Sequence, residues 1–385
     1  VDNGKISQET LDKRVAEILR IKFRLGLFDN PYRGNGKQAE QIVHSKEHQA
    51  VSLEAARQSL VLLKNETNLL PLSKSIRSIA VIGPNANEQT QLICRYGPAN
   101  APIKTVYQGI KELLPHTEVI YKKGCDIIDP HFPESEILDF PKTAEEVQLM
   151  EEAIRAAKQA EELLKAVCAT GKPIILVMLD GRASSINYAA AHIPAILHAW
   201  FPGEFCGQAV AEALFGDYNP GGRLAVTFPK SVGQIPFAFP FKPGSDESSS
   251  TSVYGALYPF GHGLSYTTFT YSDLHISPSH QGVQGDIHVS CKIKNTGKIK
   301  GDEVVQLYLR DEISSVTTYT KVLRGFERIS LKAGEEQTVH FRLRPQDLGL
   351  WDKNMNFRVE LGSFKVMLGA SSTDIRLHGQ FEITP

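Results

Sequence analysis

The stretch AIRAAKQAEELLKAVCATGKPIILVM, residues 153–178, begins with a helical pattern and ends in an apolar run typical of a buried strand. Apolar side chains recur at helical spacing from Val147 to Val167, so periodicity alone is satisfied by one long helix before that strand. On both sides the chain continues to alternate between helical and strand-like segments. Whether Ala160 and Glu161 are true neighbours therefore determines whether a strand is missing between them.

Short apolar or β-branched runs separated by helical patterns indicate a parallel sheet that is covered on both faces. Such runs are SIAVIG (78–83), EVIYKKG (118–124), PIILVML (173–179), AILHAWF (195–201) and RLAVTF (223–228). We therefore predict an α/β fold, an α/β sandwich of the doubly wound type with a mostly parallel sheet. In such sheets, ligands bind outside the carboxyl ends of the strands.

After residue 270 the pattern changes to short alternating runs, as in antiparallel strands with one buried face. These runs occupy residues 286–295, 303–311, 321–331, 337–344, 363–369 and 375–383. They predict an antiparallel β-sandwich of roughly 110 residues without helices. The predicted domains are a linker helix with its linker (1–45), the α/β sandwich (46–235), a second linker (236–272) and the β-sandwich (273–385).

The N-terminal residues 6–26 carry the apolar stripe of an amphipathic helix. Ser7 is placed to cap the first turn of this helix, and Gly26 is placed to end it. The segment 27–45 is rich in turn-forming residues and is interpreted as a surface linker. A second helix is predicted at about 46–64.

Composition excludes several classes of protein. The chain has 385 residues, of which 42% are hydrophobic and 22% charged, and its net charge of -1 gives no field that would favour nucleic acid or an anionic membrane. Its apolar runs are far shorter than the roughly 20 residues of a membrane helix. The scattered cysteines indicate isolated thiols (Cys94, Cys125, Cys168, Cys206 and Cys291). The start, VDNGKISQ, shows no signal peptide and is interpreted as a processed or truncated end.

Four long stretches carry a resemblance to a known family. They are GKISQETLDKRVAEILRIKFRLGLFDNP (4–31), EAARQSLVLLKNETNLLPL (54–72), AWFPGEFCGQAVAEALFGDYNPGGRLAVTFPKSVGQIP (199–236) and GALYPFGHGLSYTTFTYSDL (255–274). Together they resemble glycoside hydrolase family 3, the β-glucosidase and β-xylosidase group. VVQLYLRD (304–311) and KVLRGFERISL (321–331) resemble the fibronectin type III-like domain that closes many of these enzymes.

The resemblance implies a catalytic (β/α) barrel, then a linker helix, an α/β sandwich and a fibronectin type III-like domain. This chain begins at the linker helix, so the barrel, which in the family supplies the aspartate nucleophile and most sugar contacts, is absent from it. In the family, a strand and a loop with the acid/base glutamate lie between segments like AIRAAKQA and EELLKAVCATGKP. Here these flanks meet at Ala160 and Glu161, and we infer a missing segment of roughly thirty residues.

Retaining glycosidases use two carboxyl groups about 5 Å apart, and neither can be assigned to a residue of this chain. Glu161 and Glu162 are interpreted as first-turn charges of a helix. Glu134 and Glu136 are interpreted mainly as charges of a solvated loop and Glu204 as a first-turn charge, whereas Asp126 follows a strand end and could hold a loop. Arg95 and Tyr96, in LICRYGPANAP, are the candidate substrate-binding residues, because sugars stack on aromatic rings and Arg pairs with hydroxyl or carboxyl groups. A structural role for both residues stays open.

Other functional motifs are not supported. VIGPNAN has one glycine of the dinucleotide-binding fingerprint, which argues against a nucleotide-binding α/β protein. His192 and His198 are interpreted as core histidines, and His262 as a structural residue. We therefore expect no cofactor and no metal site.

Two functions remain. The first is the C-terminal part of a retaining, exo-acting hydrolase that removes terminal β-linked glucose or xylose, with the chain alone inactive. The second is a non-catalytic remnant that binds carbohydrate or a partner. The expected partners are an oligosaccharide or β-glycoside and the protein's own barrel, without nucleic acid or membrane; a homodimer stays open. The resemblance suggests a periplasmic or secreted bacterial protein.

Overall fold

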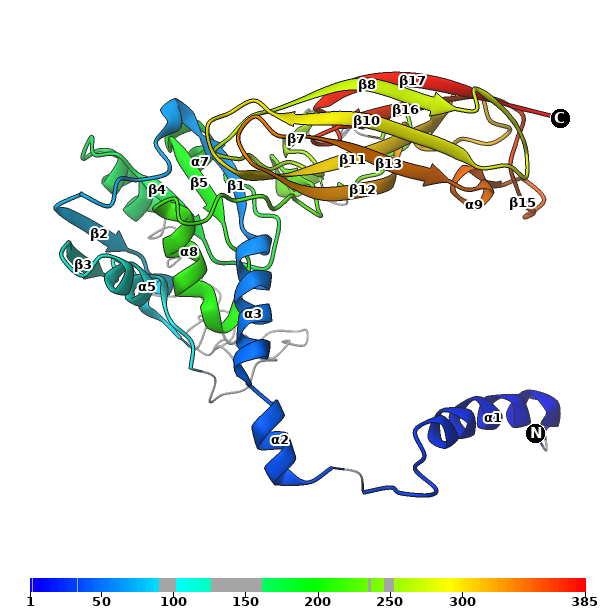
Figure 1. The fold of residues 1–385 in the computed structure, drawn as a ribbon, viewed down its shortest axis with the longest axis horizontal. Coiled ribbons are helices and arrows are strands. Elements are labelled where there is room, and N and C mark those ends of the chain that lie inside the picture. Colours follow the sequence, from blue (N-terminus) through cyan, green and yellow to red (C-terminus); the bar gives the residue numbers. More distant parts are fainter. Residues whose placement is uncertain (2, 33, 90–101, 126–160, 235–236, 246–252) are drawn as a thin grey trace, which may run out of the picture. The chain divides into compact units, whose positions relative to one another are not determined.

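The computed structural model describes the chain except for residues 2, 33, 90–101, 126–160, 235–236 and 246–252 (Figure 1). The chain separates into two compact units, Val1–Ser52 and Leu53–Pro385. Arg95, Tyr96 and Ala160 lie outside the described residues.

The first unit contains the predicted N-terminal helix, α1 (Gln8–Arg24). Ser7 caps α1 by accepting a hydrogen bond from the Thr10 backbone N–H, and Gly26 follows its end with a φ of 62°, as predicted. All residues of α1 are described and none is buried; Phe23 is 66% exposed. The apolar stripe of α1 is therefore a face without a partner among the described residues.

The segment predicted as a linker contains a second helix, α2 (Gly36–Ile42). Asn35 caps this helix, because its side chain accepts a hydrogen bond from the Gln38 backbone N–H. The turn formers of 27–45 thus mark the start of a short helix as well as a linker.

The predicted helix at 46–64 is wrong over its last residues. Helix α3 (Lys46–Ser59) ends earlier, and strand β1 (Val61–Asn65) follows it. The reason is the run Leu60–Leu63, in which every side chain is buried, so the segment needs a layer on each side. Strand β1 obtains this environment by pairing antiparallel with β5 (Ala195–His198) in the core.

The sheets of this region are small and mixed. Strand β4 (Ile175–Met178) runs parallel to β5 in the sheet β1-β5-β4, and β2 (Ser78–Ile82) runs parallel to β3 (Glu118–Lys122) in a separate pair. Both sheets pack on one apolar cluster that includes Val81 and Leu197. Four of the predicted strands are thus present in parallel pairs, and among the described residues these pairs belong to two separate sheets.

The predicted strand 223–228 is wrong except at its end. Only β6 (Phe228–Pro229) is a strand, and it pairs antiparallel with β7 (Ala256–Tyr258). Leu224 exchanges backbone hydrogen bonds with Gly261 and His262 instead. The segment is therefore held by a turn and does not join a parallel sheet.

Helices cover the α/β region and pack closely through glycine. A Cβ on Gly109 of α5 would lie 2.0 Å from the Gly207 carbonyl oxygen of α8, so neither position tolerates a side chain. Figure 1 shows α5 and α8 side by side. Residues 161–168 are also helical. The helices with complete bounds are α5 (Val106–Leu113), α7 (Asn187–His192) and α8 (Cys206–Leu214).

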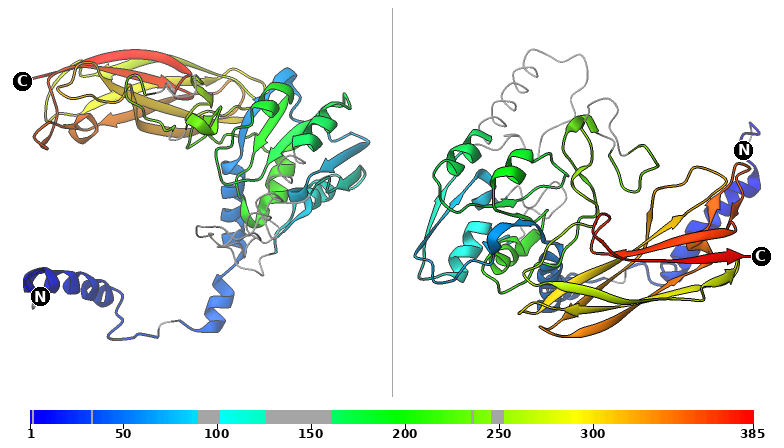
Figure 2. Two further views of the ribbon diagram at one scale, coloured as in Figure 1. Left: turned by 180° about the vertical axis from the view of Figure 1, so that it is seen from behind. Right: turned by 90° about the horizontal axis from the view of Figure 1, so that it is seen from above.

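The C-terminal region is the predicted β-sandwich, with facing sheets β13-β10-β8 and β12-β11-β16-β17-β9 (Figure 2). Each of the predicted alternating runs is confirmed as a strand. These are β10 (Ile287–Asn295), β11 (Gly301–Asp311), β12 (Val322–Leu331), β13 (Glu336–Leu343), β16 (Gly362–Gly369) and β17 (Ile375–Thr384).

One further long strand and several short elements complete the sandwich. The added strands are β8 (Phe269–Ser277), β9 (His280–Gly282), β14 (Leu350–Trp351) and β15 (Phe357–Arg358). Strand β9 pairs parallel with β17, whereas the other pairs of both sheets are antiparallel. The expectation of no helix is wrong by one turn, α9 (Pro345–Leu348), which begins at a proline.

Candidate functional site

Polar groups gather where the parallel strands β4 and β5 end. His198 is the last residue of β5 and is paired in register with Met178, the last residue of β4; Asp180 follows two residues later. The distance between His198 Nε2 and Asp180 Oδ1 is 3.0 Å. The orientation is nevertheless not that of a hydrogen bond, and neither ring nitrogen of His198 has a hydrogen-bond partner among the described residues.

Burial sets the charge of this pair. His198 is fully buried, and this burial lowers its pKa from 6.5 to about 4, so the imidazole is neutral at pH 7. Partial burial also raises the pKa of Asp180, while weak hydrogen bonds from the Arg182 backbone and the Ser184 hydroxyl act in the opposite direction. The prediction that His198 is a core residue is confirmed, but its polar atoms are not satisfied there as a core histidine's usually are.

Aromatic side chains surround the pair. Trp200 has a φ of 57°, which is unusual for a bulky residue and indicates local strain. Its ring centroid lies 4.1 Å from that of His198, and the Phe228 ring lies edge-on to His198 at 5.4 Å. Phe201, 44% exposed, lies so close to Gly181 that a Cβ there would be 2.7 Å from its ring. This edge offers a carboxyl group and an exposed ring, a combination that suits a sugar's hydroxyls and C–H face.

The flanks of the predicted loop with Arg95 and Tyr96 lie near the start of α8. Gln89 donates a side-chain hydrogen bond to the Ile103 carbonyl at 2.9 Å, which joins the two flanks. The Lys104 backbone N–H in turn donates to the Glu204 carbonyl at 3.1 Å. A pocket of about 340 Å³ opens beside these flanks, lined by Asn87, Glu88, Gln89, Thr105 and Gln108. The roles of Arg95 and Tyr96 themselves stay predictions.

The predicted acidic candidates have different outcomes. Asp126, Glu134 and Glu136 lie outside the described residues. Glu161 and Glu162 are exposed on a helical segment, and Glu161 pairs with Lys165 at 2.6 Å. Glu204 lies in the turn η3 (Gly203–Phe205) directly before α8.

The remaining expectations concern histidines, cysteines and metals. His192 is exposed at the end of α7, against the prediction of a core position, whereas His262 contacts the Leu63 carbonyl at 2.9 Å as a structural residue. Cys168, Cys206 and Cys291 form no disulfide with one another. Among the described residues, no group of three or more His, Cys, Asp or Glu side chains is placed to hold a metal ion. None of the described helices combines the length and apolar character needed to cross a membrane.

Sequence reasoning did not single out Asp180, Trp200 or Phe201. Asp180 directly follows the predicted strand 173–179, so the rule that ligands bind at carboxyl ends of strands would have marked it. Trp200 and Phe201 were predicted inside the strand 195–201, which in fact ends at His198.

Comparison with known proteins agrees with this architecture. Residues 60–266 match the glycosyl hydrolase family 3 C-terminal domain, and residues 303–372 match the fibronectin type III-like domain. The chain belongs to glycosyl hydrolase family 3. The resemblance carried by the four sequence stretches is therefore confirmed.

Several members of the family are similar over nearly the whole chain. A β-xylosidase of Formosa agariphila is 40% identical over 94% of this chain and 54% of its own length. The periplasmic β-glucosidase of Salmonella typhimurium is 35% identical over 100% of this chain and 57% of its own length. A β-glucosidase structure from Erythrobacter marinus superimposes with a TM-score of 0.86 at 32% identity, covering 100% of this chain and 57% of that one. The chain thus spans little more than half the length of these relatives.

Proposed function

We propose that this chain is the C-terminal part of a retaining, exo-acting glycoside hydrolase that removes terminal β-linked glucose or xylose from oligosaccharides or glycosides. The observation that carries the proposal is family membership, with similarity over nearly the whole chain to β-glucosidases and β-xylosidases. The Listeria innocua β-glucosidase structures with glucose and laminaribiose support a β-glucoside as the substrate class. An N-terminal barrel that carries the nucleophile would be the chain's own partner, and the exposed face of α1 is our candidate for contact with it.

The acid/base carboxyl belongs, in this proposal, to a segment missing between Ala160 and Glu161. The alignment with the Salmonella relative covers all of this chain but extends over 440 residues, so that relative contains residues without a counterpart here. Additional residues in the relative are what a missing segment in this chain requires.

The sheet topology also supports a missing strand. Strand β2 pairs only with β3 and strand β4 only with β5 among the described residues, although both sheets pack on one core cluster. A strand inserted between β2 and β4 would join them in the order β3-β2-new-β4-β5-β1, a mostly parallel sheet. The edges of β2 and β4 would then be paired, as buried strand edges require.

The carboxyl edge of this completed sheet is our candidate for the sandwich side of the sugar site. Asp180 and Phe201 lie there, and Arg95 and Tyr96 remain our proposed substrate-binding residues, since the described flanks of their segment meet the start of α8. Localisation in the periplasm or outside the cell is proposed from the name of the Salmonella relative.

The reaction of the parent enzyme tests the proposal. With an aryl β-glucoside as substrate, NMR should show that the first sugar product keeps the β configuration, because a double displacement restores the anomeric centre. Inversion would contradict the retaining mechanism.

The 385-residue chain alone is the negative control in the same assay. It should release no aryl group above the buffer rate, since both catalytic carboxyls lie elsewhere. For the naturally occurring polypeptide, an intact mass near 42.6 kDa would establish Ala160 and Glu161 as covalent neighbours and favour the binding remnant, whereas a much larger mass would favour the complete glycosidase. Turnover by this purified chain would contradict our account of the missing carboxyl groups.

A further inference from the structure

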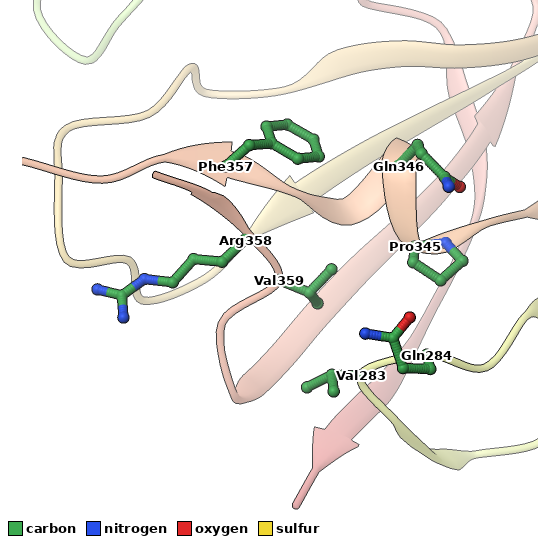
Figure 3. Close-up of a pocket in the computed structure, with 7 residues that line it drawn as sticks. All are labelled: Val283, Gln284, Pro345, Gln346, Phe357, Arg358 and Val359. Atoms are coloured by element: carbon green, nitrogen blue, oxygen red, sulfur yellow. The ribbon is translucent and has the colours of Figure 1, made fainter. Parts of the chain in front are cut away.

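The fibronectin type III-like sandwich contains a pocket of about 300 Å³, formed by three chain segments (Figure 3). The connection after β9 contributes Gln284, the first turn of α9 contributes Gln346, and β15 with the residue after it contributes Phe357 and Val359. Figure 3 shows these side chains around a common space, with the Gln284 amide directed toward Val359. The volume is at the lower end of the range for small-molecule sites.

Phe357, which lines this pocket, forms a pair of exposed aromatic rings with Trp351. Phe357 and Trp351 are register partners in the β14–β15 hairpin, with ring centroids 5.5 Å apart. They are 45% and 59% exposed, although large aromatic side chains usually stabilise a fold by burial. The Phe357 ring lies over Gly349, where an added Cβ would be 2.5 Å from it. The rings are therefore held in place and yet open to solvent, which is typical of a binding surface.

The hairpin is also fixed by a buried carboxylate. The Asp352 side chain is 1% exposed, and it accepts backbone hydrogen bonds from Asn354 at 2.8 Å and Asn356 at 3.0 Å. Arg358 pairs with the same carboxylate at 3.0 Å. A surface ordered before binding loses little conformational freedom when a ligand arrives.

We propose that this pocket and the adjoining Trp351 and Phe357 rings bind a neutral pyranose unit of an oligosaccharide or polysaccharide. The C–H face of a sugar ring would stack on the aromatic pair, and its hydroxyl groups would exchange hydrogen bonds with the amides of Gln284 and Gln346. A neutral ligand fits better than an anionic one, since the positive charge of Arg358 is already paired with Asp352. The proposed function enters only in the choice of sugars to test.

Titration of the 385-residue chain with cellotetraose and xylotetraose, followed by calorimetry, tests the site directly. We expect saturable binding, and an affinity about tenfold weaker in each of the variants Trp351→Ala and Phe357→Ala, because each removes one stacking face. Phe326→Ala is the matched control, since Phe326 is a similarly exposed aromatic residue (67%) on β12 that does not line the pocket. Urea unfolding midpoints of all variants show that the sandwich stays folded.

Three outcomes would overturn the proposal: no binding by the wild-type chain, equal weakening by Phe326→Ala, or unchanged affinity in both hairpin variants. If Trp351→Ala abolishes self-association in sedimentation experiments while sugar affinity is absent, the rings form a contact between copies, and the sugar site is refuted. These experiments measure binding and not hydrolysis. A failure of the sugar-binding proposal is therefore distinguishable from a failure of the proposed enzymatic function.

Discussion

The two domains differ in whether their buried polar groups have hydrogen-bond partners. In the β-sandwich, fully buried Asn295 accepts a hydrogen bond from Thr267 at 2.7 Å and donates to the carbonyls of Ile299 and Leu331. In the α/β domain, equally buried His198 has no hydrogen-bond partner among the described residues, although its Nε2 atom lies 3.0 Å from Asp180 Oδ1. Paired buried groups hold a framework together, whereas an unpaired group at a strand end marks a place where function or a missing segment is accommodated.

Among the described residues of the α/β domain, two of the three residues with buried polar atoms that lack a hydrogen-bond partner lie at strand ends, whereas the third, Arg223, does not. The Asn85 Oδ1 atom is also buried without a partner among the described residues, and it lies in the turn η2 (Pro84–Asn87) that follows strand β2. His198 ends β5, and strained Trp200 follows it. These features all lie at carboxyl ends of parallel strands, the edge where α/β sheets bind ligands.

The largest expected effect on stability comes from removing a buried charged side chain of the β-sandwich. Glu303 of β11 is 3% exposed, lies 3.2 Å from the guanidinium of Arg223 and accepts a hydrogen bond from Tyr271 at 2.9 Å. The variant Glu303→Ala should lower the free energy of unfolding by about 3–5 kcal/mol, because it leaves the buried charge of Arg223 unpaired. Urea denaturation followed by circular dichroism measures this loss.

The exposed pair Lys292–Asp273, 3.0 Å apart, provides the control for that variant. Lys292→Ala should cost less than about 1 kcal/mol, because solvent screens both charges. If the two variants lose equal stability, buried pairing is not what distinguishes the sandwich.

The second largest effect on stability concerns His198 of the α/β domain. Because the pKa of His198 falls from 6.5 in the unfolded chain to about 4 in the folded one, the unfolded state binds the proton first as the pH drops. The stabilisation is complete above pH 6.5 and is lost as the pH falls through 4, by up to about 3 kcal/mol. His198→Gln should flatten this part of the profile, measured as unfolding free energy between pH 7 and pH 4. Asp180, with its raised pKa, acts in the opposite direction and offsets part of the change.

His340→Gln, which removes an exposed histidine from β13, is the matched control. If both variants changed the profile equally, burial of His198 could not be its cause.

The sequence predicted the sandwich better than the site. A strand with one buried face alternates, as IHVSCKIKN (287–295) does, so its period identifies it without knowledge of its neighbours. The run LVLL (60–63) is buried on all sides and has no period, which is why a strand was interpreted as the end of a helix. Asp180 follows a predicted strand and could have been marked, whereas the contact of His198 with the Phe228 ring joins two separate segments and has no local sequence pattern.

The smallest expected effect on stability concerns a residue of the β-sandwich that, unlike Asn295, has a buried polar atom without a partner among the described residues. Asp311, at the end of β11, has a buried carboxyl oxygen without a partner among the described residues, although it belongs to the sandwich. Burial, with Glu360 and Glu312 nearby, raises its pKa from 3.8 to about 6. The folded state therefore binds the proton more tightly, and stability falls as the pH rises from 4 through 6. Asp311→Asn should be about 1 kcal/mol more stable than wild type at pH 8 and equal to it below pH 4, after allowance for solvent screening.

Urea denaturation at pH 4, 6 and 8 measures that gain, and Glu312→Gln is its control. Removing the neighbouring exposed charge should recover only a small part of the gain, because burial is the largest cause of the shift. A gain that is the same at every pH would show that the carboxylate is not the source. A loss at pH 8 would mean that the charged Asp311 carboxylate stabilises the fold, which would contradict a pKa raised by burial.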